Sequence, residues 1–233
     1  MATYLGLAQD LARECDISPV PGAVTGQTGE YADLVRWTQR AYREIENRNR
    51  WRWLRRSAQV TTTASDDTYA PSDFTDTTDS AAISRFGSWR ARDPNDPPKI
   101  YLSSSGAGGE RWLLVVPWEW FKSIYRIGTQ NTGAPAHLAI DPNNNIVIGP
   151  LPNDAYVVTL DYYMGGQELA ADGDIPEMPE RFHDLIVYRA MEKYAYRESA
   201  GEVLARAKEE GRRILRQLEL DQLDAVLFGE PMA

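Results

Sequence analysis

Cysteine, histidine and long apolar runs are scarce in this sequence of 233 residues. The single cysteine, Cys15, has no partner for an intramolecular disulfide, and its position on the apolar face of a predicted helix favours a buried thiol over a reactive one. Neither of the two histidines, His137 and His183, has a second histidine or a cysteine three or four residues away, so we expect no metal site. No apolar run is long enough to cross a bilayer, and we expect no contact with a membrane.

Positive charge is also in short supply, since 25 Lys and Arg residues face 34 Asp and Glu residues and leave a net charge of −9. A protein that coats nucleic acid needs Lys and Arg to displace counterions from the phosphates, so a sequence-specific DNA-binding protein is not expected. The first residues include early acidic side chains and no charged-then-apolar signal pattern, which predicts synthesis in the cytoplasm.

The charges are distributed unevenly along the chain. Arginines gather in residues 36–56, whereas aspartates gather in residues 66–79. Identical subunits could pair these opposite charges, and the planar guanidinium group of arginine suits fixed ion pairs at interfaces. We therefore predict a subunit interface formed by Arg36, Arg40, Arg43, Asp73 and Asp76.

Two amphipathic helices are predicted near the start of the chain. Residues 3–15 carry apolar side chains at helical spacing after Thr3, a residue type that caps helices. Residues 31–49 carry a longer apolar face, with arginines on the opposite face. Trp51 and Trp53 lie two residues apart, which predicts an extended strand around them because such side chains share one side of a strand.

Residues 57–165 are rich in β-forming side chains and turn residues. Residues 141–145 separate two short apolar runs and predict a hairpin, and Pro117 predicts the start of a short helix that ends near Tyr125. The strands are too short for βαβ units, so we expect an antiparallel sheet or a small barrel. The expected strands are residues 60–63, 83–89, 100–102, 137–140, 146–148 and 155–163.

The chain returns to helix in residues 175–200. Pro179 begins a helix whose apolar side chains cover its whole circumference, which predicts a central helix surrounded by neighbours. A last helix is expected over residues 202–229, with its packing stripe in residues 203–218.

These elements combine into an α+β fold. The N- and C-terminal helices are expected to form a helical bundle, a discontinuous core of residues 1–56 and 166–233. This core encloses an inserted, small antiparallel β domain of residues 57–165.

No catalytic motif stands out. The sequence contains no nucleophile elbow, no P-loop and no Ser-His or Cys-His constellation, and the glycine-rich residues 106–109 lack the Lys-Ser/Thr of a phosphate loop. The acidic residues cluster with Thr, Ser and Pro in predicted loops, which favours solvated loops over the carboxylate pair of a glycosidase. We therefore predict a protein that is not an enzyme and needs no cofactor.

The tryptophans and tyrosines leave one alternative open. Because only five phenylalanines are present, Trp and Tyr are expected to supply the large core side chains. If they were exposed instead, their rings could stack on sugars or bases.

Four segments, taken in order, carry a resemblance to a known family. They are GQTGEYADLVRWTQRAYREIENRNRWRWLR at residues 26–55, GAPA at 133–136, DYYMGG at 161–166 and IPEMPERFHDLIVYRAMEKYAYRE at 175–198. Together with the opening helix and its glycine-rich loop, they resemble the adaptor, or head-to-tail connector, proteins of tailed bacteriophages. The resemblance covers nearly the whole chain.

The resemblance implies a structural protein of the virion neck that is made in the host cytoplasm. Family members form a closed ring, normally of about twelve copies, beneath the portal protein, and they extend the DNA channel toward the tail. The implied partners are other copies of the chain, the portal protein and tail or nozzle proteins, with transient non-specific contact with passing DNA. The alternative from another class is a carbohydrate-binding or carbohydrate-active virion protein that uses Trp89 and Trp112.

A last set of apolar side chains, near the C-terminal end, lies outside the packing stripe of residues 203–218. Fully burying each of them would contribute about 1.5 to 3 kcal/mol, so their exposure suits a surface that a partner later covers. In the adaptor family the C-terminal helix or tail is a usual contact with the portal. We predict a portal-docking element here, with packing on a neighbouring adaptor as the alternative; its residues are Leu220, Leu223, Leu227 and Phe228.

Overall fold

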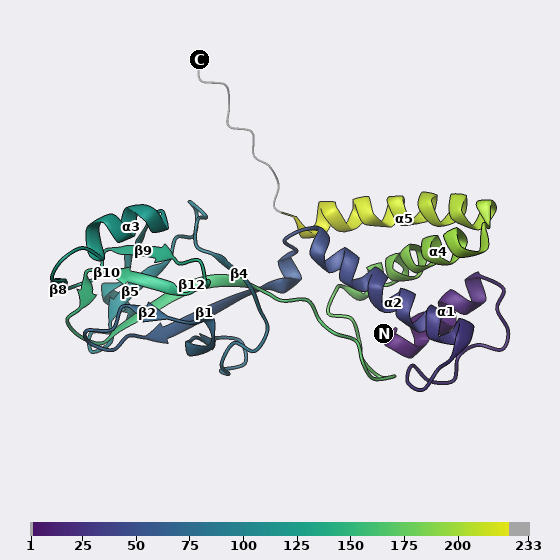
Figure 1. Cartoon of the computed structure of the whole chain (residues 1–233), viewed down its shortest axis with the longest axis horizontal. Coiled ribbons are helices and arrows are strands. Elements are labelled where there is room, and N and C mark those ends of the chain that lie inside the picture. Colours follow the sequence, from purple (N-terminus) through teal and green to yellow (C-terminus); the bar gives the residue numbers. More distant parts are fainter. Residues whose placement is uncertain (1, 224–233) are drawn as a thin grey trace, which may run out of the picture. The chain divides into compact units, whose positions relative to one another are not determined.

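The chain folds into two compact units, seen in a computed structural model that describes residues 2–223 (Figure 1). The first, which we call the helical unit, combines residues 1–53 with residues 166–233. The second, the β unit, is formed by residues 54–165 and contains every strand that the structure describes. The chain is therefore an α+β protein, as its sequence predicts, in which helices precede and follow a strand region.

The helical unit is built from four α-helices: α1 (Tyr4–Glu14), α2 (Gly29–Arg48), α4 (Asp184–Glu198) and α5 (Gly201–Gln222). The predicted cap at Thr3 is confirmed, because its hydroxyl accepts a hydrogen bond of 3.1 Å from the backbone N–H of Gly6. This bond satisfies one of the N–H groups that the first turn of a helix leaves unpaired.

Helix α4 is the central helix of this unit, as predicted. It packs against α1, α2 and α5, and its buried side chains lie on several sides of the helix. The start differs from the expectation, because Pro179 precedes a 3-10 turn, Glu180–Phe182, and α4 begins only at Asp184. The buried side chains of α4 are Leu185, Ile186, Val187, Ala190, Met191 and Ala195.

Helix α5 follows α4 directly and packs along it. Gly211 lies on the buried face of α5, where an added Cβ atom would be in ordinary van der Waals contact, 3.5 Å from the Cβ atom of Tyr188 on α4. Helix α5 ends at Gln222, because Leu223 adopts extended backbone angles (φ −97°, ψ 145°) although its N–H still donates to the carbonyl of Glu219. The rest of the helix expected up to residue 229 lies outside the described residues. The buried stripe of α5 is Ala207, Gly211, Leu215 and Leu218.

The longest strand pair of the β unit joins its two ends. Strand β1 (Arg55–Thr61) runs antiparallel to β12 (Tyr156–Met164), with Arg55 opposite Tyr163. Around this pair the first sheet has the order β3-β1-β12-β5-β6, and β4 also pairs with β12. The bounds of the added strands are Thr75–Asp76 for β3, Phe86–Arg90 for β4, Lys99–Leu102 for β5 and Arg111–Trp112 for β6.

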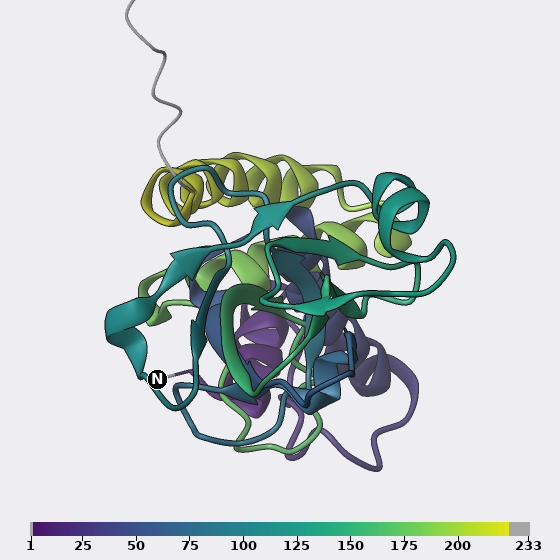
Figure 2. The same ribbon diagram turned by 90° about the vertical axis from the view of Figure 1, so that its left-hand side faces the viewer.

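A second sheet has the order β2-β10-β9-β7, and the strands β8 and β11 form a separate parallel pair. Most pairings are antiparallel, as predicted, but β7 runs parallel to β9. The turned view in Figure 2 shows the short strands and long connections of the β unit. The bounds are β2 Thr68–Tyr69, β7 Leu114–Val115, β8 Thr132–Gly133, β9 His137–Ile140, β10 Ile146–Gly149 and β11 Leu151–Pro152.

The predicted hairpin and short helix of the β unit are both confirmed. Strands β9 and β10 are joined by a turn in which the Asp141 carboxylate accepts 2.8 Å hydrogen bonds from the N–H groups of Asn143 and Asn145. Asn144 takes a left-handed conformation (φ 64°) that asparagine tolerates. Helix α3 (Trp118–Tyr125) follows Pro117 and buries Phe121.

The predicted strand around Trp51 and Trp53 is wrong. Arg52–Leu54 is a 3-10 turn, and the strand begins only at Arg55. The two indole rings still share one side of the chain, because they stack with centroids 4.9 Å apart and planes 12° apart. The Trp51 ring N–H also donates a 2.6 Å hydrogen bond to the carbonyl of Ile45, which fixes the chain as it leaves α2.

Candidate interaction surfaces

An arginine stripe lies on the exposed side of α2. The Arg36 guanidinium forms an ion pair with Asp33, and that of Arg43 lies 3.1 Å from the Glu168 carboxylate. Arg40 lies between them, is exposed, and forms no ion pair within the part of the chain that the structure describes. The stripe therefore faces solvent with one cation left uncompensated at its centre.

The two predicted acidic partners differ in their surroundings. Asp73 is exposed, and its carboxylate accepts a 2.7 Å hydrogen bond from the N–H of Ala70. Asp76 is only 4% exposed and accepts hydrogen bonds from the Tyr162 hydroxyl (2.6 Å) and the Thr78 N–H (2.7 Å). Burial opposes the charge of Asp76, but these hydrogen bonds outweigh it and lower its pKa.

Asp76 is therefore a structural residue of the β unit, and the prediction that it lies at a subunit interface is wrong. A carboxylate that is buried beneath the surface cannot reach an arginine of a neighbouring copy. Strand β3 has only two residues, Thr75 and Asp76. Such a short strand shows no alternating pattern, so the sequence does not reveal which of the two side chains points inward.

The predicted portal-docking residues lie at and beyond the end of α5. Leu220 is 78% exposed, and Leu223 is half-buried just after the helix. Leu227 and Phe228 lie outside the described residues. Of the two side chains that the structure describes, Leu220 is the exposed one.

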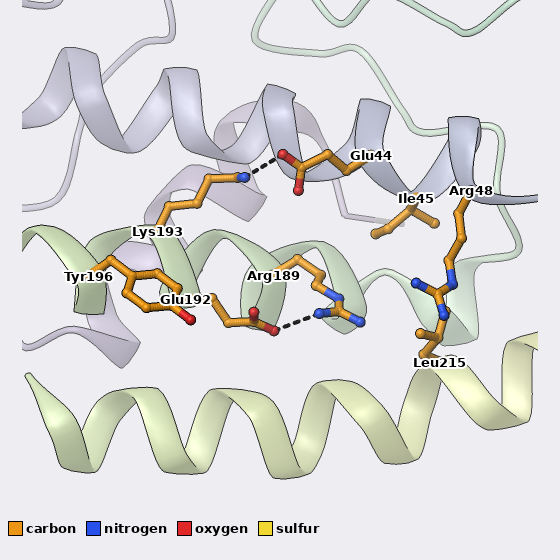
Figure 3. Close-up of a pocket in the computed structure, with 8 residues that line it drawn as sticks. All are labelled: Glu44, Ile45, Arg48, Arg189, Glu192, Lys193, Tyr196 and Leu215. Atoms are coloured by element: carbon orange, nitrogen blue, oxygen red, sulfur yellow. Dashed lines mark hydrogen bonds and ion pairs between the residues drawn. The ribbon is translucent and has the colours of Figure 1, made fainter.

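A groove runs between α2, α4 and α5 of the helical unit, with a volume of about 220 Å³ (Figure 3). Lys193 of α4 and Glu44 of α2 form an ion pair of 2.5 Å across it, and Arg189 pairs with Glu192 along α4 at 2.8 Å. Arg48, at one end of the groove, lies 3.2 Å from Glu219 of α5. Two of these ion pairs join neighbouring helices and one lies within α4, so each of these charged groups already has a partner.

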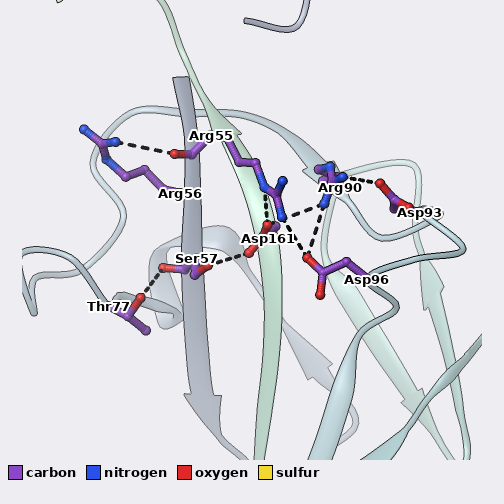
Figure 4. A network of polar contacts seen from close by, with 8 residues as sticks. All are labelled: Arg55, Arg56, Ser57, Thr77, Arg90, Asp93, Asp96 and Asp161. Atoms are coloured by element: carbon purple, nitrogen blue, oxygen red, sulfur yellow. Dashed lines mark hydrogen bonds and ion pairs between the residues drawn. The ribbon is translucent and has the colours of Figure 1, made fainter. Parts of the chain in front are cut away.

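A polar cluster in the β unit brings two carboxylates into contact with two arginines (Figure 4). Asp161 accepts 2.5 Å hydrogen bonds from the Arg55 Nε–H and from the Ser57 hydroxyl. The Asp96 carboxylate accepts from Arg55 at 2.9 Å and from Arg90 at 3.2 Å. A glycosidase leaves one carboxyl protonated and free to reach the substrate, whereas both groups here are bound to guanidinium. The cluster therefore serves to join β1, β4 and β12.

An aromatic surface covers another part of the β unit, and we define it by Trp112, Leu114, Trp120 and Ile124. These side chains are 71%, 62%, 41% and 52% exposed, respectively. The Trp120 ring lies 5.1 Å from the ring of His137, which pairs with Leu114 in the sheet. Trp112 and Leu114 flank the buried Leu113 in an extended segment. Because neighbouring side chains of a strand point to opposite faces, their exposure follows from the burial of Leu113.

Trp89, the other tryptophan of the carbohydrate alternative, is a core residue. It is 6% exposed, contacts the rings of Phe74, Phe86 and Tyr162, and donates a 2.6 Å hydrogen bond to the carbonyl of Asn144. Of the two tryptophans in the carbohydrate-binding alternative, only Trp112 is exposed and could contact a sugar.

The thiol of Cys15 and the ring of His183 are both buried in the protein. Cys15 is buried, as predicted, and burial together with Glu14 and Asp16 raises its pKa to about 12, which leaves the thiol protonated at neutral pH. His183 is 3% exposed, with Nε2 3.0 Å from the carbonyl of Met178. Within residues 2–223, no three His, Cys, Asp or Glu side chains gather as metal ligands, and no helix is long and apolar enough to span a membrane.

Comparison with known proteins adds one match. A family model described as SU10 adaptor protein matches residues 2–229, which is nearly the whole chain. Among curated proteins no match is found.

Proposed function

This chain belongs to the SU10 adaptor protein family, and we propose that it forms a ring that docks on the portal protein and extends the DNA channel toward the tail. The family is one of structural phage adaptors, not of enzymes. The match over residues 2–229 is the observation that carries the proposal, because both units of the chain take part in it. We place the protein in the neck of the virion, as a ring of about twelve copies after synthesis in the host cytoplasm.

The direct test combines the purified chain with the portal protein encoded in the same phage genome. We expect sedimentation velocity and electron microscopy to show a ring of adaptor copies on the portal, and a smaller species without it. A chain that stays monomeric both with and without the portal contradicts the proposal.

For contacts between copies, we propose the arginine stripe of α2 and the exposed Asp73. The support is that Arg40 is exposed and forms no ion pair within the described residues, while the guanidinium groups of Arg36 and Arg43 are themselves about half exposed. Arg40→Glu should reduce ring formation on the portal, whereas Arg13→Glu on α1 serves as the control, since Arg13 is also an exposed arginine on a helix. Equal ring formation by the two variants contradicts this contact.

For docking on the portal, we propose the end of α5 with the residues that follow it, Leu220, Leu223, Leu227 and Phe228. The exposed Leu220 supports this assignment, because a soluble subunit gains from covering such a side chain. For the tail or nozzle proteins, we propose the aromatic surface of the β unit, which belongs to a different unit of the chain. Contact with passing DNA is transient and non-specific in this proposal.

A carbohydrate-binding virion protein is the second candidate, favoured by the exposure of Trp112 and Trp120. A glycan array that compares the wild type with Trp112→Ala and Trp120→Ala tests it. Binding that both substitutions abolish supports this candidate, and an array without signal counts against it. The same two variants, assayed for tail attachment, test the aromatic surface as the contact with tail proteins.

A further inference from the structure

Helix α5 presents a ridge of exposed side chains that plays no part in packing the helical unit. Arg212, Arg216 and Leu220 follow one another at intervals of four residues, and side chains at this spacing form a continuous ridge on a helix. All three are exposed, whereas the buried stripe of α5 occupies a different face. We call these three residues the basic ridge.

The two arginines of the basic ridge are uncompensated. Within residues 2–223, neither Arg212 nor Arg216 has an ion pair or a hydrogen bond, although Arg206 pairs with Glu14 and Arg213 pairs with Glu210 on the same helix. Like charges four residues apart repel each other and destabilise a helix slightly. Leu220, at 78% exposure, adds apolar surface in contact with water. The ridge thus lowers the stability of the free subunit and suits a surface that becomes covered.

The order of chemical groups on the ridge restricts what can cover it. Two guanidinium groups lie one helical turn apart, about 6 Å along the axis, and an apolar side chain lies one turn further. Guanidinium groups bind carboxylates through paired hydrogen bonds, so the matching surface presents two carboxylates at this spacing and a small apolar pocket beyond them.

We propose that the basic ridge docks against an acidic surface of the portal protein. This inference rests on the proposed docking of the chain on the portal, and it adds the charge of the partner surface and the residues that recognise it. The acidic groups of the portal neutralise Arg212 and Arg216, while Leu220 anchors the end of the contact in the apolar pocket.

One feature favours a protein over nucleic acid as the occupant: the exposed apolar side chain of Leu220 lines the same shallow surface as Arg212 and Arg216. Leu220 has no matching group on a row of phosphates, but it fits a protein surface that combines carboxylates with an apolar pocket.

The test measures binding of the full-length chain to the purified portal protein at several NaCl concentrations. The variant Arg212→Gln/Arg216→Gln should bind at least about tenfold more weakly at low salt, because both charge-assisted contacts are lost. Arg13→Gln/Lys122→Gln is the control for charge, since it removes the same charge from two sites away from the ridge and should bind as the wild type does. Leu220→Ser should weaken binding but retain its dependence on salt. Circular dichroism and melting establish that each variant is folded.

The outcomes separate this inference from the proposed function. If the wild type binds the portal and the Arg212→Gln/Arg216→Gln variant binds equally well, the basic ridge is not the contact, although docking on the portal stands. If the wild type does not bind the portal at any salt concentration, both the proposed function and this inference fail.

Two further results also overturn the inference. One is a ridge variant that loses binding to duplex DNA or to other copies of the chain while it keeps its affinity for the portal. The other concerns the wild type alone and needs no variant: binding to the portal that stays constant from about 50 mM to about 500 mM NaCl excludes a contact between opposite charges.

Discussion

Glu46 shows how one buried carboxylate can hold a chain segment in place. It is 3% exposed, and both of its oxygens lie 3.1 Å from the backbone nitrogen of Gln167. The Tyr42 hydroxyl, one turn earlier on α2, donates to the Gln167 side chain and accepts from the N–H of Glu177. Burial, and then the Glu46 charge, raise the pKa of Tyr42. The segment from residue 166 to residue 177 is thereby bonded to α2.

Replacing Glu46 should therefore destabilise the helical unit. Glu46→Ala leaves the Gln167 N–H without this acceptor, at a cost of about 1 to 3 kcal/mol in the free energy of unfolding. Glu44→Ala, which removes an exposed carboxylate two residues away, should cost about 1 kcal/mol or less. Urea unfolding followed by circular dichroism measures both. If both variants lowered the free energy of unfolding by the same amount, the buried contact of Glu46 would contribute no more than the exposed one of Glu44.

Asp76 provides a prediction for the dependence of stability on pH. Its pKa is lower in the folded protein than the value of about 3.9 of an unfolded chain. The charged carboxylate therefore contributes stability above that value, and this contribution is lost as the pH falls through the folded pKa. We expect Asp76→Asn to lower the unfolding free energy most at neutral pH, with a difference from the wild type that shrinks below about pH 4.

The control for this experiment is Asp73→Asn, which changes an exposed carboxylate nearby. Tyr162→Phe, which removes the shortest hydrogen bond to Asp76, should also reduce the acid dependence. Unfolding free energies from tryptophan fluorescence at several pH values provide the measurement. A constant difference between the wild type and Asp76→Asn from neutral to acidic pH would refute the assignment.

Among the elements, the helices follow from the sequence and the shortest strands do not. A helix of twenty residues such as α2 repeats its apolar positions over several turns, so its pattern is unmistakable. Strands of two residues, such as β2, β3 and β6, contain no period at all, and pairing partners far along the chain decide whether they form. The turn at Arg52–Leu54 was missed for a related reason, since stacked indole rings fit both a strand and a tight turn.

The candidate surfaces follow the same rule. Arg40 and Leu220 could be placed on exposed helix faces from periodicity, because each lies opposite a clear apolar stripe. The aromatic surface could not, because Trp120 and His137 come together only through the packing of α3 on the second sheet. The Arg212–Arg216 pair was visible in the sequence as part of a charged face, but only the structure shows that neither arginine has an ion-pair partner within residues 2–223.

At the level of α5, removing the residues that follow it tests the docking element. A chain that ends at Leu223 keeps the ion pair between Arg48 and Glu219 and the pair between Arg181 and Asp221. We therefore expect its melting temperature to match that of the full chain, within about 2 °C. Its binding to the portal should be weaker, because Leu227 and Phe228 are gone, and Leu220→Ser should weaken it further. Unchanged incorporation into portal-containing particles would remove these residues from the docking element.

For the whole molecule, the insertion of one unit into the other has a simple structural basis. The β unit begins and ends on neighbouring strands, because Arg55 and Tyr163 face each other across β1 and β12. Paired residues of antiparallel strands lie only about 5 Å apart. The two ends of the inserted β unit are therefore close together in space. Each unit also has its own core, and that of the β unit includes Phe74, Trp89, Ile100 and Val158.

We expect a fragment of residues 54–165 to fold without the helical unit. Its Trp89 is packed among aromatic rings, so the folded fragment should give a near-ultraviolet circular dichroism signal that urea removes in one cooperative transition. The variant Trp89→Leu identifies the contribution of that ring. A fragment with no near-ultraviolet signal and no cooperative transition would show that the β unit depends on the helical unit.

The pairing of Arg55 with Tyr163 also determines how the molecule carries mechanical load. A tensile force transmitted from one unit to the other is shared by two covalent connections, because the chain crosses between the units near residue 54 and again near residue 165. The two connections continue into strands that are hydrogen-bonded to each other along seven registered pairs, from Arg55 and Tyr163 to Thr61 and Val157. A cut in either connection would leave the other to join the two units covalently, and the severed part of the helical unit would be held by the packing of α1 and α2 on α4.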